Sequence, residues 1–159
     1  MIRTLTHIFL CILLSSAAAG ADAGAEINLS GAWQYRFIQS EKDYPPKEGT
    51  SWEPITIPNR YLFETIAARQ NITRGYILYR KTVSLKEDIS RPLVFQAGEI
   101  MNADIVYING EKIGKTGMFP PDFKSGWSKF RNYPVPPGLL KKGGNTIDIV
   151  NYFDAELWI

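Results

Sequence analysis

The sequence predicts an all-β protein, a jelly-roll β-sandwich with one short helical insertion. Short apolar segments alternate with turn residues along the whole chain, and 13 glycines and 10 prolines are spread among them. Aromatic residues make up 13% of the sequence. Segments of this kind, bounded by such residues, are typical of strands, and about eight of them in one domain fit a sandwich or jelly roll.

Eight segments have the composition of strands. The first follows the turn residues Leu29–Gly31, and the second is closed by Pro58. In chain order they are Ala32–Ile38, Trp52–Ile57, Tyr76–Leu85, Leu93–Ala97, Ala103–Ile108, Glu111–Thr116, Arg131–Val135 and Thr146–Tyr152.

The third and fourth segments show two kinds of apolar pattern. In Tyr76–Leu85 the odd-numbered positions are apolar at period two, except that Lys81 interrupts them. This alternation predicts a strand with one buried face. Leu93–Ala97 begins with three apolar residues in a row, as expected of a strand that is buried on both faces.

The fifth and sixth segments flank Asn109-Gly110. This dipeptide between two such runs is a strong hairpin signal, because a type I′ turn needs positive φ at both central positions. We assign the pair to a turn and expect no ligand there. In the last segment Ile147 and Ile149 share one face, which again predicts a strand.

One internal stretch has a different period. Tyr61–Gln70 places Leu62 and Ile66 at helical spacing. We expect one or two helical turns around Leu62–Ala68, inserted between strands.

Residues 1–23 have the pattern of a secretory signal peptide. Arg3 is followed by the apolar run Leu5–Leu14 and then by small residues that end in an A-x-A site at Ala21 and Ala23. The run of about ten residues is too short to cross a bilayer, and no later segment is as apolar, so we expect no membrane span in the mature chain. We predict a secreted or periplasmic protein with one domain over residues 27–159.

Cleavage after Ala23 would also remove the only histidine, His7, and the only cysteine, Cys11. The mature chain would then lack Ser-His-Asp and Cys-His catalytic machinery, zinc sites built on these residues, and disulfides. We expect no cofactor, although aspartate and asparagine oxygens would suffice for a structural calcium site. The net charge of +2 gives no indication of nucleic-acid binding.

Five motifs occur in an order that resembles a known module. They are Gly31–Tyr35, Trp52–Pro58, Gly75–Val83, Ile105–Gly114 and Gly143–Ile147. The arrangement resembles the galactose-binding-like jelly roll at the N-terminus of glycoside hydrolase family 2 enzymes, with related modules in sialate O-acetylesterases and in periplasmic sensor proteins of bacteria. The resemblance covers about Leu29 to Tyr152.

The resemblance implies a non-catalytic module attached to another domain. We expect a secreted carbohydrate-binding or supporting module of a larger glycoside hydrolase or esterase-type protein. The alternative is an extracytoplasmic ligand-sensing domain of a bacterial membrane signalling protein. The family 2 version more often carries a His-Gly pair after the hairpin, where this chain has Lys115–Gly117. The segments Gly98–Asp104 and Arg131–Pro136 look more like the esterase and sensor versions.

The chain ends on the apolar triplet Leu157–Ile159. Related modules have a further strand after the one that resembles Thr146–Tyr152. We therefore expect the last strand to be truncated and a covalently linked domain to follow in the parent protein.

The stretch Met118–Arg131 is the best candidate for ligand binding. It combines Phe119 and Trp127 with Asp122 and Arg131, and sugar sites need flat aromatic rings together with groups that hydrogen-bond hydroxyls. Three interpretations remain open: a carbohydrate site, a loop held to the sandwich by its own aromatics, and a docking surface for the linked domain.

Three further residues have side chains of a type that contacts sugars. Asp104, beside the hairpin, is a further candidate for bonding a sugar hydroxyl, although an aspartate there more often caps a loop or faces solvent. Trp33 and Trp52 lie in strand patterns, and we assign them to the core rather than to a stacking platform.

Overall fold

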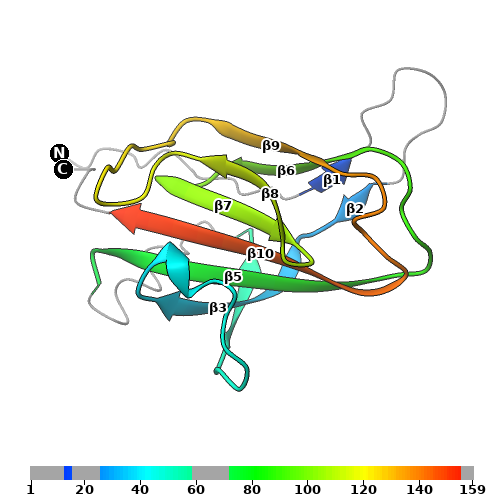
Figure 1. Ribbon diagram of the computed structural model, residues 1–159, viewed down its shortest axis with the longest axis horizontal. Coiled ribbons are helices and arrows are strands. Elements are labelled where there is room, and N and C mark those ends of the chain that lie inside the picture. Colours follow the sequence, from blue (N-terminus) through cyan, green and yellow to red (C-terminus); the bar gives the residue numbers. More distant parts are fainter. Residues whose placement is uncertain (1–12, 16–25, 59–71, 155–159) are drawn as a thin grey trace.

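The computed structural model describes residues 13–15, 26–58 and 72–154 (Figure 1), and these residues form an antiparallel two-sheet sandwich. The helical insertion expected around Leu62–Ala68 lies outside the described residues, as does Leu157–Ile159. The strands are β1 (Leu13–Ser15), β2 (Ile27–Asn28), β3 (Gly31–Ile38), β4 (Glu53–Ile57), β5 (Arg74–Leu85), β6 (Leu93–Glu99), β7 (Ala103–Ile108), β8 (Glu111–Thr116), β9 (Phe130–Val135) and β10 (Gly143–Asp154), with a 3-10 turn η1 (Glu41–Asp43). The all-β sandwich is confirmed.

The two sheets differ in size. One has four strands in the order β2-β1-β6-β9, and the other has six in the order β4-β3-β5-β10-β7-β8. The long strands β5 and β10 lie side by side in the centre of the larger sheet (Figure 1) and pair along twelve residues, from Gly143 opposite Leu85 to Asp154 opposite Arg74. All eight strands expected from the sequence are present.

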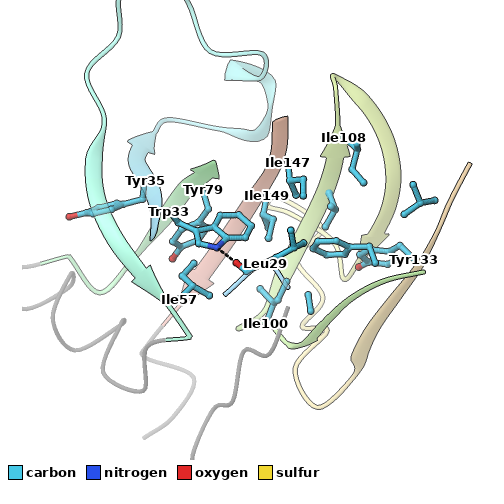
Figure 2. Packing of buried hydrophobic residues seen from close by; sticks show 14 of the residues in the cluster. Leu29, Trp33, Tyr35, Ile57, Tyr79, Ile100, Ile108, Tyr133, Ile147 and Ile149 are labelled. Carbon is cyan, nitrogen blue, oxygen red and sulfur yellow. Dashed lines mark hydrogen bonds between the residues drawn. The ribbon is translucent and has the colours of Figure 1, made fainter. Parts of the chain in front are cut away.

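The core lies between the sheets. Trp33, Tyr35, Ile147 and Ile149 are buried there (Figure 2). Phe95 belongs to the same cluster. The indole Nε1 of Trp33 donates to the carbonyl of Leu29 at 2.7 Å, so the polar end of this ring is satisfied inside the core. The prediction that Trp33 belongs to the core is confirmed.

Two details of the strand patterns have a clear physical cause. Lys81, which interrupts the apolar face of β5, extends to the sheet margin, where its ammonium donates to the carbonyls of Ser30 and Ala32 at 3.2 and 3.0 Å. It therefore fits the alternating pattern without burying an unpaired charge.

The prediction for β6 was wrong in part, because Val94 and Gln96 are only half-buried and the strand has one fully buried face.

The hairpin β7–β8 turns at Asn109 and Gly110, whose φ angles are 50° and 83°. Both are positive, as the type I′ prediction requires. The Asn109 side chain also joins the turn to neighbouring segments, because its amide donates to the carbonyl of Leu139 and its oxygen accepts from the backbone N–H of Thr146.

The short strand β1 lies inside the predicted signal peptide. Leu13 and Leu14 pair with Asn28 and Ile27 of β2 on one side and with Gln96 and Phe95 of β6 on the other. Signal cleavage after Ala23 would remove β1, so the backbone groups of β6 that pair with it would lose their partner.

Candidate functional site

A second apolar cluster lies on the side of the six-stranded sheet that faces away from the core. We call this side the outer face. Strand residues that alternate with the core positions contribute Tyr76, Leu78, Ile105, Val150 and Tyr152. A sheet that is apolar on both faces must be covered on its second face or must bind something there.

The segment between β3 and β4 covers one half of the outer face, and η1 lies in front of the sheet there (Figure 1). Ser40 caps this turn, since its hydroxyl accepts from the N–H of Lys42 and the Asp43 carboxylate accepts from the N–H of Ser40. Next to η1, the Tyr44 ring stacks on Tyr107 of β7 with centroids 3.9 Å apart. The segment is thus fastened to the sheet by an aromatic stack.

An ion pair lies under this segment. Arg80 of β5 donates from Nε and Nη2 to the two carboxylate oxygens of Asp148 on β10, at 2.7 Å each. The Tyr44 hydroxyl donates to the same carboxylate at 3.1 Å. Burial, with the negative charge of Asp148 next, raises the pKa of Tyr44 well above its ordinary value, so this phenol stays a donor.

Trp52, just before β4, lies beside two arginines. The guanidinium carbon of Arg80 is 4.8 Å from the centre of the indole ring, and that of Arg36 is 5.9 Å away. These are cation–π distances. Trp52 is half-buried on the outer face, which corrects its assignment to the core.

The other half of the outer face is covered by the segment between β8 and β9. Phe119 of this segment is buried and stacks on Tyr76 of β5 with centroids 5.8 Å apart. Phe123 lies 5.2 Å from the ring of Tyr152, and Lys115 places its ammonium 5.3 Å from the Phe119 ring. Partly exposed rings and charged groups therefore alternate across this face.

Arg131 holds this segment from the core side of the six-stranded sheet. Its side chain is fully buried and donates to the carbonyls of Ile100, Gly126 and Lys129. The N–H of Gly126 donates to the carbonyl of Asn102 at 2.6 Å. A Cβ at Gly126 would lie 2.5 Å from the Thr116 side chain, so only glycine fits here.

Asp104 neutralises Arg131. Its carboxylate accepts from Arg131 Nε and from the Tyr133 hydroxyl, both at 2.7 Å. Burial raises the pKa of Asp104, and the Arg131 charge and the Tyr133 hydrogen bond oppose that rise. Both members of the pair have side chains with 0% exposure. They cannot touch a sugar directly, which corrects the prediction that Arg131 and Asp104 contact a ligand.

The remaining predicted site residues lie in different surroundings. Phe119 is packed against the sheet, Asp122 is exposed, and Trp127 is half-buried, with its backbone N–H donating to the Ser125 hydroxyl at 3.2 Å. The contacts of Phe119 and Arg131 support the interpretation that this segment is a loop held to the sandwich by its own side chains. They leave Trp127 and Asp122 as the predicted residues that reach the surface.

Most of the outer face was not predicted from the sequence. A signal was present, because Tyr76 and Leu78 of β5 and Val150 and Tyr152 of β10 are apolar or aromatic and alternate with the core positions. The segment that covers the outer face could not be predicted from the sequence, because Tyr44 meets Tyr107 and Asp148 only when the chain folds η1 back over the sheet.

Within the residues that the structure describes, no group of three or more histidine, cysteine or acidic side chains is placed to hold a metal ion. The same residues contain no helix long and apolar enough to cross a membrane.

The fold is shared with part of several solved glycosidases. A β-glucuronidase of Faecalibacterium prausnitzii is 17% identical over 88% of this chain and 21% of its own, with a TM-score of 0.55. A β-glucuronidase of an uncultured Clostridium sp. is 13% identical over 94% of this chain and 24% of its own, with a TM-score of 0.56. A β-D-mannosidase of Dictyoglomus thermophilum is 17% identical over 80% of this chain and 15% of its own, with a TM-score of 0.51.

These likenesses show the fold alone, which this chain shares with one part of each of these enzymes. The chain spans about a fifth of the length of these enzymes. No protein-family model and no curated protein sequence matches the chain.

Proposed function

We propose that this chain is a non-catalytic module of a larger glycoside hydrolase or esterase-type protein. It is exported by its N-terminal signal, and it binds carbohydrate on the outer face or supports a covalently linked domain. The observation that carries the proposal is the unequal coverage. The fold accounts for 88% and 94% of this chain but only 21% and 24% of two β-glucuronidase chains.

The outer face supports the carbohydrate part of the proposal. Tyr107, Tyr76 and Phe123 are half-buried rings, and the Arg80–Asp148 pair lies beside Tyr44 on the same face. Pyranose rings have an apolar face that packs on aromatic rings and hydroxyls that need charged or polar partners. The outer face offers both within one sheet.

The chemistry of the carboxylates supports a non-catalytic role. Glycoside hydrolysis needs two carboxyl groups about 5–9 Å apart across a cleft. The two buried aspartates that pair with arginine, Asp104 and Asp148, are each held by a guanidinium and a tyrosine hydroxyl. Both carboxylates are almost completely buried, so neither is placed to reach a glycosidic bond.

The test uses the full chain, collected after export and screened against a glycan panel. Phe123→Ala removes a ring from the outer face, and Phe130→Ala removes a 72% exposed ring at the start of β9 as the matched control. We expect about tenfold weaker glycan binding or more for Phe123→Ala and wild-type binding for Phe130→Ala.

Two results would contradict the proposal. One is hydrolysis of aryl glycosides or acetyl esters by the pure chain that disappears when a single carboxylate is changed. The other is the absence of any glycan binding together with coding sequence after Ile159 that specifies no further domain. A block of membrane helices encoded there would support the sensor alternative.

A further inference from the structure

Arg36, Arg80 and Arg131 lie against the six-stranded sheet, and Arg36 differs from the other two because no described acidic side chain pairs with it. Arg131 binds Asp104, and Arg80 binds Asp148 through two hydrogen bonds. Arg36, on the outer side of β3, is different. In the described part of the chain its Nε and Nη1 are cut off from solvent and have no hydrogen-bond partner.

Two donors left in this state are costly. A buried donor without an acceptor costs about 1–3 kcal/mol, and more when the group is charged. Cross-strand neighbours offer no relief, because Arg36 lies opposite Leu78 of β5. Glu53 of β4 is close in the sheet but lies opposite Tyr35, whose hydroxyl donates to its carboxylate at 2.6 Å. Tyr35 belongs to the core side of β3, whereas Arg36 belongs to the outer side.

The third nitrogen of Arg36 gives access to the group. The residue as a whole is half-buried, and Nη2 is not among the nitrogens that are cut off from solvent. Both hydrogen-bonding edges of a guanidinium include Nη2, one with Nε and one with Nη1. An anion that docks on Nη2 therefore accepts from the accessible nitrogen and lies next to one of the two buried donors whichever edge it takes.

The surroundings are suited to a sugar that carries the anion. Trp52 lies beside the Arg36 guanidinium and is half-buried, so an apolar ring surface is next to the cation. The positive charge of the neighbouring Arg80 is balanced by Asp148, so the charge of Arg36 is the unbalanced one of the two beside Trp52.

We propose that Arg36 binds the carboxylate of an acidic saccharide on the outer face. This inference rests on the proposed carbohydrate-binding function and names the chemical class of its ligand. The ring of the sugar lies against the outer face near Trp52, and the carboxylate accepts from Nη2 and offsets the charge that the protein leaves unbalanced.

The experiment titrates the full chain with galacturonate, with galactose as the neutral sugar of the same stereochemistry, and with acetate as the carboxylate without a ring. The test variant is Arg36→Gln, and the control is Arg91→Gln, which removes an exposed arginine before β6. We expect galacturonate to bind at least about tenfold more tightly than galactose or acetate, and Arg36→Gln to abolish this preference while Arg91→Gln keeps it. The melting temperature of ligand-free Arg36→Gln should equal or exceed that of the wild type, because the partly buried charge without a partner is gone.

The other outcomes overturn the inference in distinguishable ways. Equal binding of acetate and galacturonate would mean that no saccharide is recognised. Binding of neutral glycans that Arg36→Gln does not alter would remove Arg36 from the site but leave the proposed function in place. A lower melting temperature for ligand-free Arg36→Gln, with no change in galacturonate binding, would assign Arg36 a structural role. No binding of any sugar to the wild type would reject this inference and the carbohydrate-binding part of the proposed function, and would leave only the support of a linked domain.

Discussion

Changing Asp104 to asparagine should test what the buried ion pair does. Asp104→Asn keeps the shape of the side chain but removes the charge that neutralises Arg131, whose side chain has 0% exposure. Breaking a buried pair by removing one partner costs about 3–5 kcal/mol, because the remaining charge stays buried and unpaired. We expect a loss in this range in the free energy of unfolding.

Replacing the other partner should cost at least as much. Arg131→Met leaves the Asp104 carboxylate buried without its cation, and the carbonyls of Ile100, Gly126 and Lys129 also lose their donor. We expect about 5 kcal/mol, at the upper end of the range for buried pairs. Because Gly126 and Lys129 belong to the segment between β8 and β9, this segment should lose hydrogen-exchange protection first.

The assay is urea unfolding of the wild type and the two variants, with Asp122→Asn as the control for Asp104→Asn. Asp122 is exposed, and a substitution there should stay within about 0.5 kcal/mol of the wild type. A loss below about 1 kcal/mol for Asp104→Asn would refute the reasoning, since it would mean that water or a rearranged side chain neutralises Arg131. A changed urea dependence would point instead to a changed unfolded state.

Three further predictions concern packing, pH and the loop. Gly114→Ala should cost about 1–3 kcal/mol in the free energy of unfolding, because a Cβ there would lie 2.2 Å from the Tyr133 ring, while Gly144→Ala, with open space around it, should cost far less. Burial, helped by the Asp104 charge, raises the pKa of Tyr133 above 10.0, so the stability from this group is complete below pH 10 and is lost as the pH rises through the higher folded pKa. Above pH 10 the free energy of unfolding of the wild type should therefore fall by up to about 1.4 kcal/mol per pH unit through this group, and Tyr133→Phe should lack that contribution. Trp127→Ala should weaken glycan binding by roughly thirtyfold if the ring stacks on a sugar, whereas a drop in melting temperature with unchanged glycan affinity would make the ring part of the packing.

The strands could be predicted from the sequence because each depends on local patterns. Asn109-Gly110 fixes its hairpin through the backbone preferences of two residues, and β7 and β8 have the bounds that the sequence predicts. The alternation of Ile147 and Ile149 identifies the core side of β10 in the same way. Patterns of this kind need no knowledge of which strands become neighbours.

The roles of charged side chains could not be predicted in this way. Arg131 and Asp104 are 27 residues apart, and their pairing depends on how β7 and β9 are placed in different sheets. Seen in sequence, both are charged residues in or beside a polar loop, which favoured a surface role. Tyr44 and Asp148 are 104 residues apart and meet only after the sheet has formed. Topology therefore decides which polar groups remain available to a ligand.

The ion pair between the sheets and the outer face are connected through one loop. Arg131 holds the carbonyl of Gly126 from below, and Trp127 follows Gly126 directly. Phe119 holds the same loop from the outer face by its stack on Tyr76. A residue with 0% exposure can therefore set the position of a ring that reaches the surface. If Trp127 contacts sugar, Arg131 acts on binding as a positioning residue, and loss of Arg131 must lower glycan affinity through the loop, without any contact between its own side chain and the ligand.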